Sequence, residues 1–273
     1  AVGQEALYLN TASNNTAVGR SALVTNTTGA YNTAVGANAL DANTTANYNT
    51  SVGYLSLSAV TTGGNNTGAG VDTLKVLTTG YQNSAFGSLA LDAVTTGIDN
   101  VAVGFLAGSS ITTANFNTHI GKEAGNNVTT GGNVTCIGYK ANASSATASG
   151  EITLGNNTVS TLRCNDQTIN SLSDGRDKTE VIDLPLGLEF LNTLRPVKFK
   201  WETRDGNSKD GSYDAGFIAQ DLQSAQSASN AEYLKMVMES NPDRLEAAYG
   251  RLIPVLVKAV QELSAKVAAL EAN

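Results

Sequence analysis

The sequence predicts two architectures in one chain: an all-β parallel β-roll, or β-solenoid, with 17-residue coils, and then an α+β domain that ends in a long helix. Three observations lead to this prediction. A glycine recurs with a strict period of 17, small and apolar residues alternate just before it, and charged residues become frequent only after residue 172. A fixed period of this kind indicates stacked supersecondary units.

The glycine column is the clearest mark of the repeat. It consists of Gly19, Gly36, Gly53, Gly70, Gly87, Gly104, Gly121, Gly138 and Gly155. The motif reads "NTAVGRSAL" at 15–23 and "NTAVGANAL" at 32–40. Glycine suits tight turns that need a positive φ. Four residues earlier lies an asparagine column: Asn15, Asn32, Asn49, Asn66, Asn83, Asn100 and Asn117. We expect these asparagines to stack as an amide ladder.

Two further columns predict a strand just before each glycine. The apolar column, directly before the glycine, is Val18, Val35, Val52, Ala69, Phe86, Val103, Ile120, Ile137 and Leu154. The small column, one residue earlier, is Ala17, Ala34, Ser51, Gly68, Ala85, Ala102, His119, Cys136 and Thr153. Alternation with period two is typical of a strand, and β-branched residues suit a buried strand position. We therefore expect the apolar column to be buried.

A leucine column lies four residues after the glycine: Leu23, Leu40, Leu57, Leu74 and Leu91. Even with it, each coil offers only two or three apolar positions, so the core of a single chain is thin. We expect the small column to supply further burial by packing closely against identical chains. The sequence thus favours a homotrimeric fibre, with a monomeric solenoid as the alternative.

Charge separates the two parts of the chain. Residues 1–172 contain five Lys or Arg and eight Asp or Glu, whereas residues 173–273 contain twelve and sixteen. We predict a repeat shaft at 1–155, a neck or linker at 156–172 and a separate domain at 173–273. The net charge of −7 argues against nucleic acid as a partner. No apolar run reaches 18 residues and no signal peptide is visible, so we expect no membrane insertion.

The chain offers few metal ligands. His119 is the single histidine, and no cysteine or acidic cluster is spaced around it as ligands would be. His119 and Cys136 share a column on adjacent coils, so they should stack about one strand spacing apart. A metal site at a trimer axis is one interpretation, and drift of the repeat is the one we favour. Cys136 and Cys164 are interpreted as two free thiols or one chance pair. We expect no cofactor and no metal.

The C-terminal part predicts ordinary elements. They are a short helix within 185–194, a strand at 197–201, a loop at 204–212 and a strand running into a helix start at 215–222. A final helix carries an a/d heptad seam: Ile253, Leu256, Val260, Leu263, Val267 and Leu270. β-branched residues at a with leucine at d favour two-stranded coiled coils, which counts against a trimer. Alternatively, this seam packs on the rest of its own domain.

Four motifs in the C-terminal part resemble one known family. They are "SDGRDK" (173–178), "LEFLNTLRPVKFKWE" (188–202), "GFIAQDL" (216–222) and "LIPVLVKAVQEL" (252–263). Together they resemble peptidase S74, the intramolecular chaperone domains at the C-termini of phage tail fibres and tailspikes. The repeats of 1–155 are similar to the coils of trimeric adhesin heads and phage fibre shafts. The S74 resemblance implies an α+β trimer that drives trimerisation of the fibre and then cuts itself off.

The same resemblance implies the site residues. Ser173 would be the nucleophile, Lys178 its general base, and Leu172–Ser173 the bond that is cut, with no activity on external substrates. A serine needs a base, and a lysine in that role must be neutral, which desolvation or a neighbouring cation favours. We expect Arg176 to supply that cation and Asp174 to point toward Arg176 rather than toward Lys178. Spacing alone would predict only a capped loop or linker.

The resemblance implies the C-terminal part of a trimeric bacteriophage tail fibre, carried on the virion and assembled in the bacterial cytoplasm. Its partners would be its own copies, the upstream fibre parts and a host cell-surface glycan or protein. The alternatives are a bacterial trimeric surface adhesin and an uncleaved structural fibre with an inactive chaperone domain. A carbohydrate-degrading tailspike would need paired carboxylates and aromatic platforms, and residues 1–172 have only eight acidic residues and no tryptophan.

Overall fold

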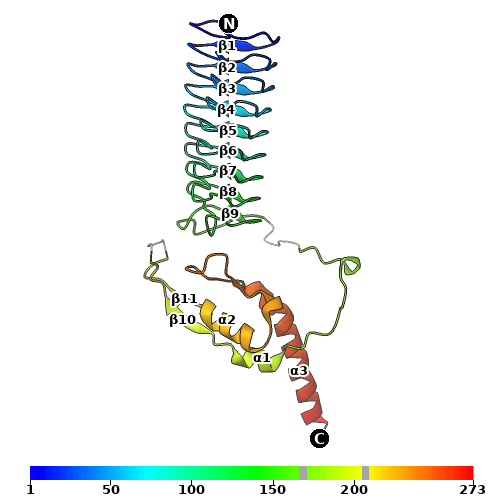
Figure 1. The fold of residues 1–273 in the computed structure, drawn as a ribbon. Helices are drawn as coiled ribbons and strands as arrows, with labels where there is room; N and C mark the ends of the chain where they lie inside the picture. Colours follow the sequence, from blue (N-terminus) through cyan, green and yellow to red (C-terminus); the bar gives the residue numbers. More distant parts are fainter. Residues whose placement is uncertain (166–170, 205–208, 273) are drawn as a thin grey trace. The chain divides into compact units, whose positions relative to one another are not determined.

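The computed structural model describes residues 1–165, 171–204 and 209–272. The chain divides into two compact units, Ala1–Val159 and Ser160–Asn273. Figure 1 shows the repeat as a stack of coils and the C-terminal residues as helices with short strands. In the described part of the chain, no helix is both long enough and apolar enough to cross a membrane.

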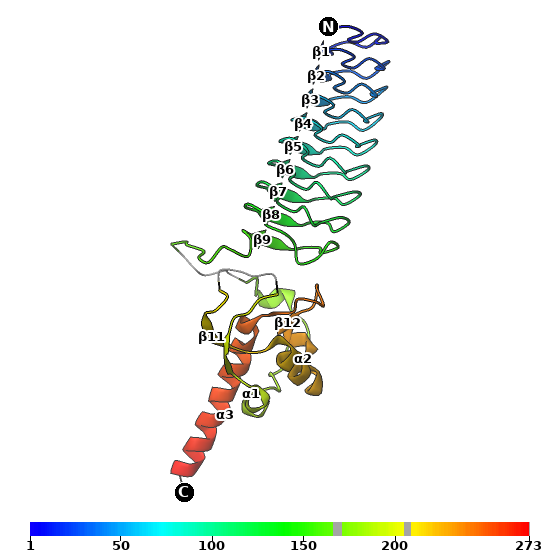
Figure 2. The same ribbon diagram turned by 90° about the vertical axis from the view of Figure 1, so that its left-hand side faces the viewer.

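The N-terminal unit is the predicted parallel β-solenoid. Its strands form one sheet in chain order, and Figure 2 shows them along one side of the stack. Every neighbouring pair is parallel, and the register is one coil throughout, so that Thr16 pairs with Thr33 and Ala17 with Ala34. The strands are β1 (Thr16–Val18), β2 (Thr33–Val35), β3 (Thr50–Val52), β4 (Thr67–Ala69), β5 (Ser84–Phe86), β6 (Val101–Val103), β7 (Thr118–Ile120), β8 (Thr135–Ile137) and β9 (Ile152–Leu154).

The glycine column is explained by both backbone conformation and close approach. From Gly19 to Gly138 the φ angles of the column lie between 120° and 147°, a region that L side chains rarely adopt. A Cβ added at Gly36 would also lie 2.3 Å from the carbonyl oxygen of Gly53 on the next coil. The predicted positive φ is therefore confirmed, and any side chain here would separate adjacent coils.

The asparagine column forms the predicted ladder. Asn66 donates from its backbone N to Asn49 Oδ1 at 2.9 Å, and its own Nδ2 donates to the carbonyl oxygen of Gly80 at 3.0 Å. Asn83 repeats the pattern against Asn66, at 3.0 Å from its backbone N. Each amide thus satisfies backbone groups of neighbouring coils that would otherwise be buried without a partner.

The expected orientation of the strands is wrong. Ala17, Ala34, Ala85 and the rest of the small column through Cys136 face the interior and are fully buried. The large members of the apolar column face outward and are between 37% and 53% exposed. The reason is the narrow interior: a Cβ added at Gly68 would lie 3.3 Å from Leu57 Cγ, so only a small side chain fits opposite the leucine.

The leucine column is the predicted second apolar column and is fully buried. These leucines adopt left-handed φ angles of 51° to 54°. That conformation costs about 1–2 kcal/mol for a non-glycine residue. Burying a leucine side chain contributes about 1.5–3 kcal/mol, which offsets the cost.

His119 fits into the narrow interior because glycine replaces the leucine that other coils place beside this position. It occupies the inward position of β7, and glycine replaces leucine at the fourth position after the repeat glycine on two coils, at Gly108 and Gly125. A Cβ added at Gly125 would lie 2.1 Å from His119 Nδ1. Since the column faces the interior of one chain, the interpretation of a metal site on a trimer axis is wrong. Cys136 and Cys164 are free thiols, so no pair forms.

The C-terminal unit is a small α+β region, as predicted. Its elements are the 3-10 helices η1 (Gly175–Asp177), η2 (Glu232–Leu234) and η3 (Tyr249–Leu252), the helices α1 (Leu188–Thr193), α2 (Ala219–Ala228) and α3 (Ile253–Glu271), and the strands β10 (Val197–Lys200), β11 (Tyr213–Gly216), β12 (Val237–Met238) and β13 (Glu246–Ala247). Strands β10 and β11 pair antiparallel, as do β12 and β13. The core gathers Phe190, Ala231, Leu234, Met236, Leu252 and Val255.

The predicted elements are found with different bounds. The helix within 185–194 begins only at Leu188, and the strand predicted from 215 ends at Gly216, before α2 begins at Ala219. The predicted loop 204–212 includes 205–208, and the predicted neck 156–172 includes 166–170; both stretches lie outside the described residues.

Helix α3 is the predicted long helix, and its seam is exposed. Val255 and Ala259 form its buried side, and Val255 belongs to the core that also contains Phe190 of α1. The six seam residues, Ile253, Leu256, Val260, Leu263, Val267 and Leu270, are between 45% and 76% exposed. The alternative that the seam packs on its own domain is therefore wrong.

Candidate functional site: the Ser173–Lys178 turn

A single turn brings the two ends of "SDGRDK" together. Asp174 caps η1 by accepting a hydrogen bond from the backbone N of Arg176 at 2.9 Å. At the other end, Lys178 donates from its backbone N to the carbonyl oxygen of Gly175 at 3.3 Å. Side-chain capping by aspartate is typical of a helix start, and it reverses the chain so that Lys178 returns toward Ser173.

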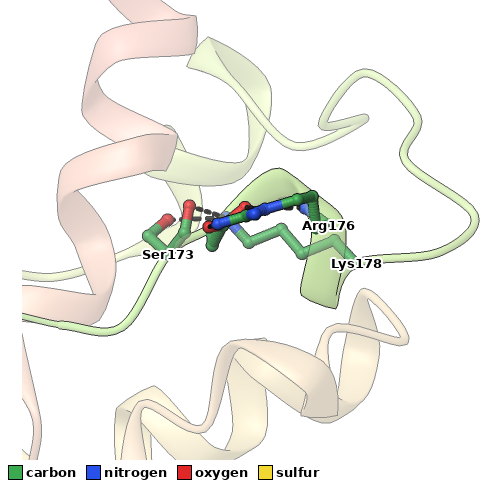
Figure 3. A network of polar contacts seen from close by, with 4 residues as sticks. Ser173, Arg176 and Lys178 are labelled. Atoms are coloured by element: carbon green, nitrogen blue, oxygen red, sulfur yellow. Dashed lines mark hydrogen bonds and ion pairs between the residues drawn. The ribbon is translucent and has the colours of Figure 1, made fainter.

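The amine of Lys178 contacts the hydroxyl of Ser173. Lys178 Nζ is 2.5 Å from Ser173 Oγ and 3.1 Å from the Ser173 carbonyl oxygen. Figure 3 shows the lysine side chain running back along the turn to the serine. This distance is within the hydrogen-bond reach that a nucleophile and its base require. A charged amine donates to Oγ in this geometry, whereas a neutral amine can accept the hydroxyl proton.

Asp174 and Arg176 form the expected pair. Arg176 donates from Nη2 to Asp174 Oδ2 at 2.5 Å and from Nε to both carboxylate oxygens at 3.1 Å. The hydrogen bonds from the Arg176 side chain and backbone lower the pKa of Asp174, and Asp174 in turn raises the pKa of Arg176. The carboxylate is thus ionised and occupied by the arginine.

The turn is open to solvent in a single chain. Ser173, Asp174, Arg176 and Lys178 are all exposed, and Leu172 on the other side of the predicted bond is fully exposed. The bond is therefore accessible, but no described part of the same chain removes water from the amine.

Two apolar surfaces lie outside this turn. The first, here named the apolar stripe, is the outward column Val18, Val35, Val52, Ala69, Phe86, Val103, Ile120, Ile137 and Leu154. The second is the exposed seam of α3. The sequence contained both the apolar column and the small column of the repeat, but alternation alone does not tell which of the two faces outward.

An apolar groove of about 680 Å³ lies beside the seam and has no counterpart in the sequence pattern. Its lining includes Leu194, Val197, Phe217, Leu252 and Leu256. These residues come from segments distant in the chain, so no local pattern predicts the groove. Among the residues that the structure describes, no group of three or more His, Cys, Asp or Glu is arranged to hold a metal ion.

Comparison with known proteins relates one stretch of the C-terminal part to a family. Residues 173–230 match the family model of Peptidase_S74, described as the chaperone of endosialidase. A search of the curated proteins and a search of the solved structures found no match. The match begins at Ser173, the first residue of the turn. The resemblance predicted from the sequence is thus confirmed: the C-terminal region of this chain carries a peptidase S74 domain, preceded by a parallel β-solenoid.

Proposed function

We propose that this chain is the C-terminal part of a homotrimeric bacteriophage tail fibre whose S74 domain assembles the fibre and then cuts itself off at Leu172–Ser173. The observation that carries the proposal is the contact of Lys178 Nζ with Ser173 Oγ, at the residue where the family match begins. The solenoid is then the structural shaft, carried on the virion, with the host cell surface as its target.

In the proposed cleavage, neutral Lys178 takes the proton of the Ser173 hydroxyl. The Oγ attacks the carbonyl carbon of Leu172, and an ester forms while the peptide C–N bond breaks. The Ser173 nitrogen receives the proton and becomes a free amine. Water then hydrolyses the ester, which restores the hydroxyl and leaves a new carboxylate on Leu172. Each step needs only a nucleophile, a base and water.

The apolar stripe supports assembly from identical chains. It runs over nine coils at a spacing of about 4.8 Å per strand, so it repeats with the period of the coil. A second copy in parallel has the same repeat and can match it along its whole length. Contiguous exposed apolar surface of this kind marks an interaction site in a soluble protein. The exposed seam of α3 supports the same conclusion for the C-terminal unit.

Assembly would also switch on the cut. The amine of Lys178 is exposed in one chain, and burial by partner chains would disfavour its charged form. Cleavage would then wait until three chains have packed, which prevents premature loss of the chaperone.

The test is processing of the full chain, followed on denaturing gels with mass spectrometry of the fragments. Wild type should yield a fragment that begins at Ser173. Ser173→Ala should stay whole but still trimerise, and Lys178→Arg should stay whole because arginine does not give up its proton. Ser171→Ala, two residues away, is the matched control and should be cut normally. Processing of Ser173→Ala at the same bond would refute the proposed nucleophile.

A further inference from the structure

The Asp174 carboxylate is a competitor for the lysine amine. Asp174 stands next to Ser173 in sequence and opens the same short turn that returns Lys178 to the serine. A carboxylate that paired with Lys178 would hold it in the charged form and draw it away from Oγ. In the structure this does not happen, because three donors of Arg176 (its backbone N, Nε and Nη2) occupy the carboxylate.

We propose that Arg176 is a positioning residue that sequesters the Asp174 carboxylate and thereby keeps Lys178 on Ser173. The inference rests on the proposed self-cleavage and assigns a role within it. It differs from the sequence expectation that Arg176 acts as a cation beside Lys178. A guanidinium paired with a carboxylate carries little net charge toward the amine, so sequestration agrees better with the observed contacts.

Of the acidic residues near Lys178, Asp174 is the one whose pairing changes between the variants compared below. Among the described residues, the Lys178 amine makes two hydrogen bonds, and both go to Ser173. Two other acids lie near in sequence, Asp177 within η1 and Glu180 beyond the turn, and both are exposed. They remain in every variant compared below, so any difference between the variants comes from Asp174 and Arg176.

The experiment measures the rate of fragment release from the full chain, synthesised in a cell-free extract as a pulse and then held at pH values from 6 to 10. Arg176→Ala frees the carboxylate, which should capture Lys178. We expect cleavage to slow by about tenfold at neutral pH, because the carboxylate holds the amine in its charged form, and to recover at alkaline pH. Arg251→Ala, which removes another exposed arginine, should leave the rate unchanged.

The double variant Asp174→Asn with Arg176→Ala makes the test specific. Asparagine keeps an oxygen to cap the turn but has no charge to hold the amine, so the rate and the pH profile should return to within about threefold of wild type. A double variant as slow as Arg176→Ala would show that Arg176 only stabilises the turn, and an unchanged rate in Arg176→Ala would also overturn the inference. If wild type releases no fragment, the proposed self-cleavage itself fails, which separates the two claims.

Discussion

The solenoid and the C-terminal unit differ in what a single chain completes. In the solenoid, one chain encloses its own interior: the leucines and the small column through Cys136 are buried, and the asparagine ladder bonds neighbouring coils. Its outer apolar stripe is left exposed. In the C-terminal unit, the proposed catalytic pair is not enclosed by its own chain: Ser173 and Lys178 are in contact, but both are exposed. The shaft thus encloses its interior within one chain, whereas the proposed site needs other chains to exclude water from it.

The largest effect should come from charging the apolar stripe. Replacing Val52 and Val103 by aspartate places several like charges in each proposed trimer interface, where unpaired carboxylates are strongly disfavoured. We expect trimers to be lost and cleavage to stop, although each chain keeps its solenoid. Sedimentation and gel analysis of the fragments would measure both.

A matched control exists on another face of the coil. Val76 is 39% exposed, the same as Val103, but it lies outside the stripe. Val76→Asp should therefore leave assembly and cutting unchanged. Equal loss of trimers in the two variants would mean that the stripe has no special role.

The next largest effect concerns the interior. Leu74→Ala removes a fully buried side chain from the narrow space opposite the small column. Such a cavity costs about 2–5 kcal/mol of unfolding free energy. Val76→Ala, on the surface, should cost less than about 0.5 kcal/mol. Denaturant titration compares them, and a similar small loss in both would contradict a tightly packed interior.

Much of this fold could be predicted from period alone. A strict spacing of 17 predicts stacked coils, and the glycine and asparagine columns carry their own physical reasons. The inward side of the strand could not be predicted, because alternation defines two faces without saying which is enclosed. The available space decides it: where Leu57 lies opposite Gly68, the interior admits only a small residue at the inward position.

For the site, the resemblance named Ser173 and Lys178, and the structure places their side chains in contact. The expected pairing of Asp174 with Arg176 is present. The exposure of the turn and the apolar groove could not be read from the chain, because both depend on residues that meet only after folding.

A smaller and pH-dependent effect should arise at His119. The ring is fully buried, neither nitrogen has a hydrogen-bond partner among the described residues, and desolvation lowers its pKa from 6.5 to about 4. The folded state therefore binds fewer protons than the unfolded state between these values. Stability is retained above pH 6.5 and falls as the pH drops toward 4, by up to about 3 kcal/mol.

Thermal unfolding between pH 7 and pH 4 would measure this loss. The control is His119→Ala combined with Gly125→Leu, which recreates the Ala85 and Leu91 pair of an earlier coil. That variant should lose less stability on acidification than wild type. An equal loss in both proteins would remove His119 as the cause.

The central claim is that assembly through the stripe leads to one cut at the start of the S74 domain. Its most direct measurement is native mass spectrometry of the purified wild-type protein, followed by denaturing mass spectrometry of the same sample. The account predicts a particle with three copies of the shaft, each ending at Leu172, and C-terminal fragments that begin at Ser173. Whole chains in a monomeric particle would contradict it.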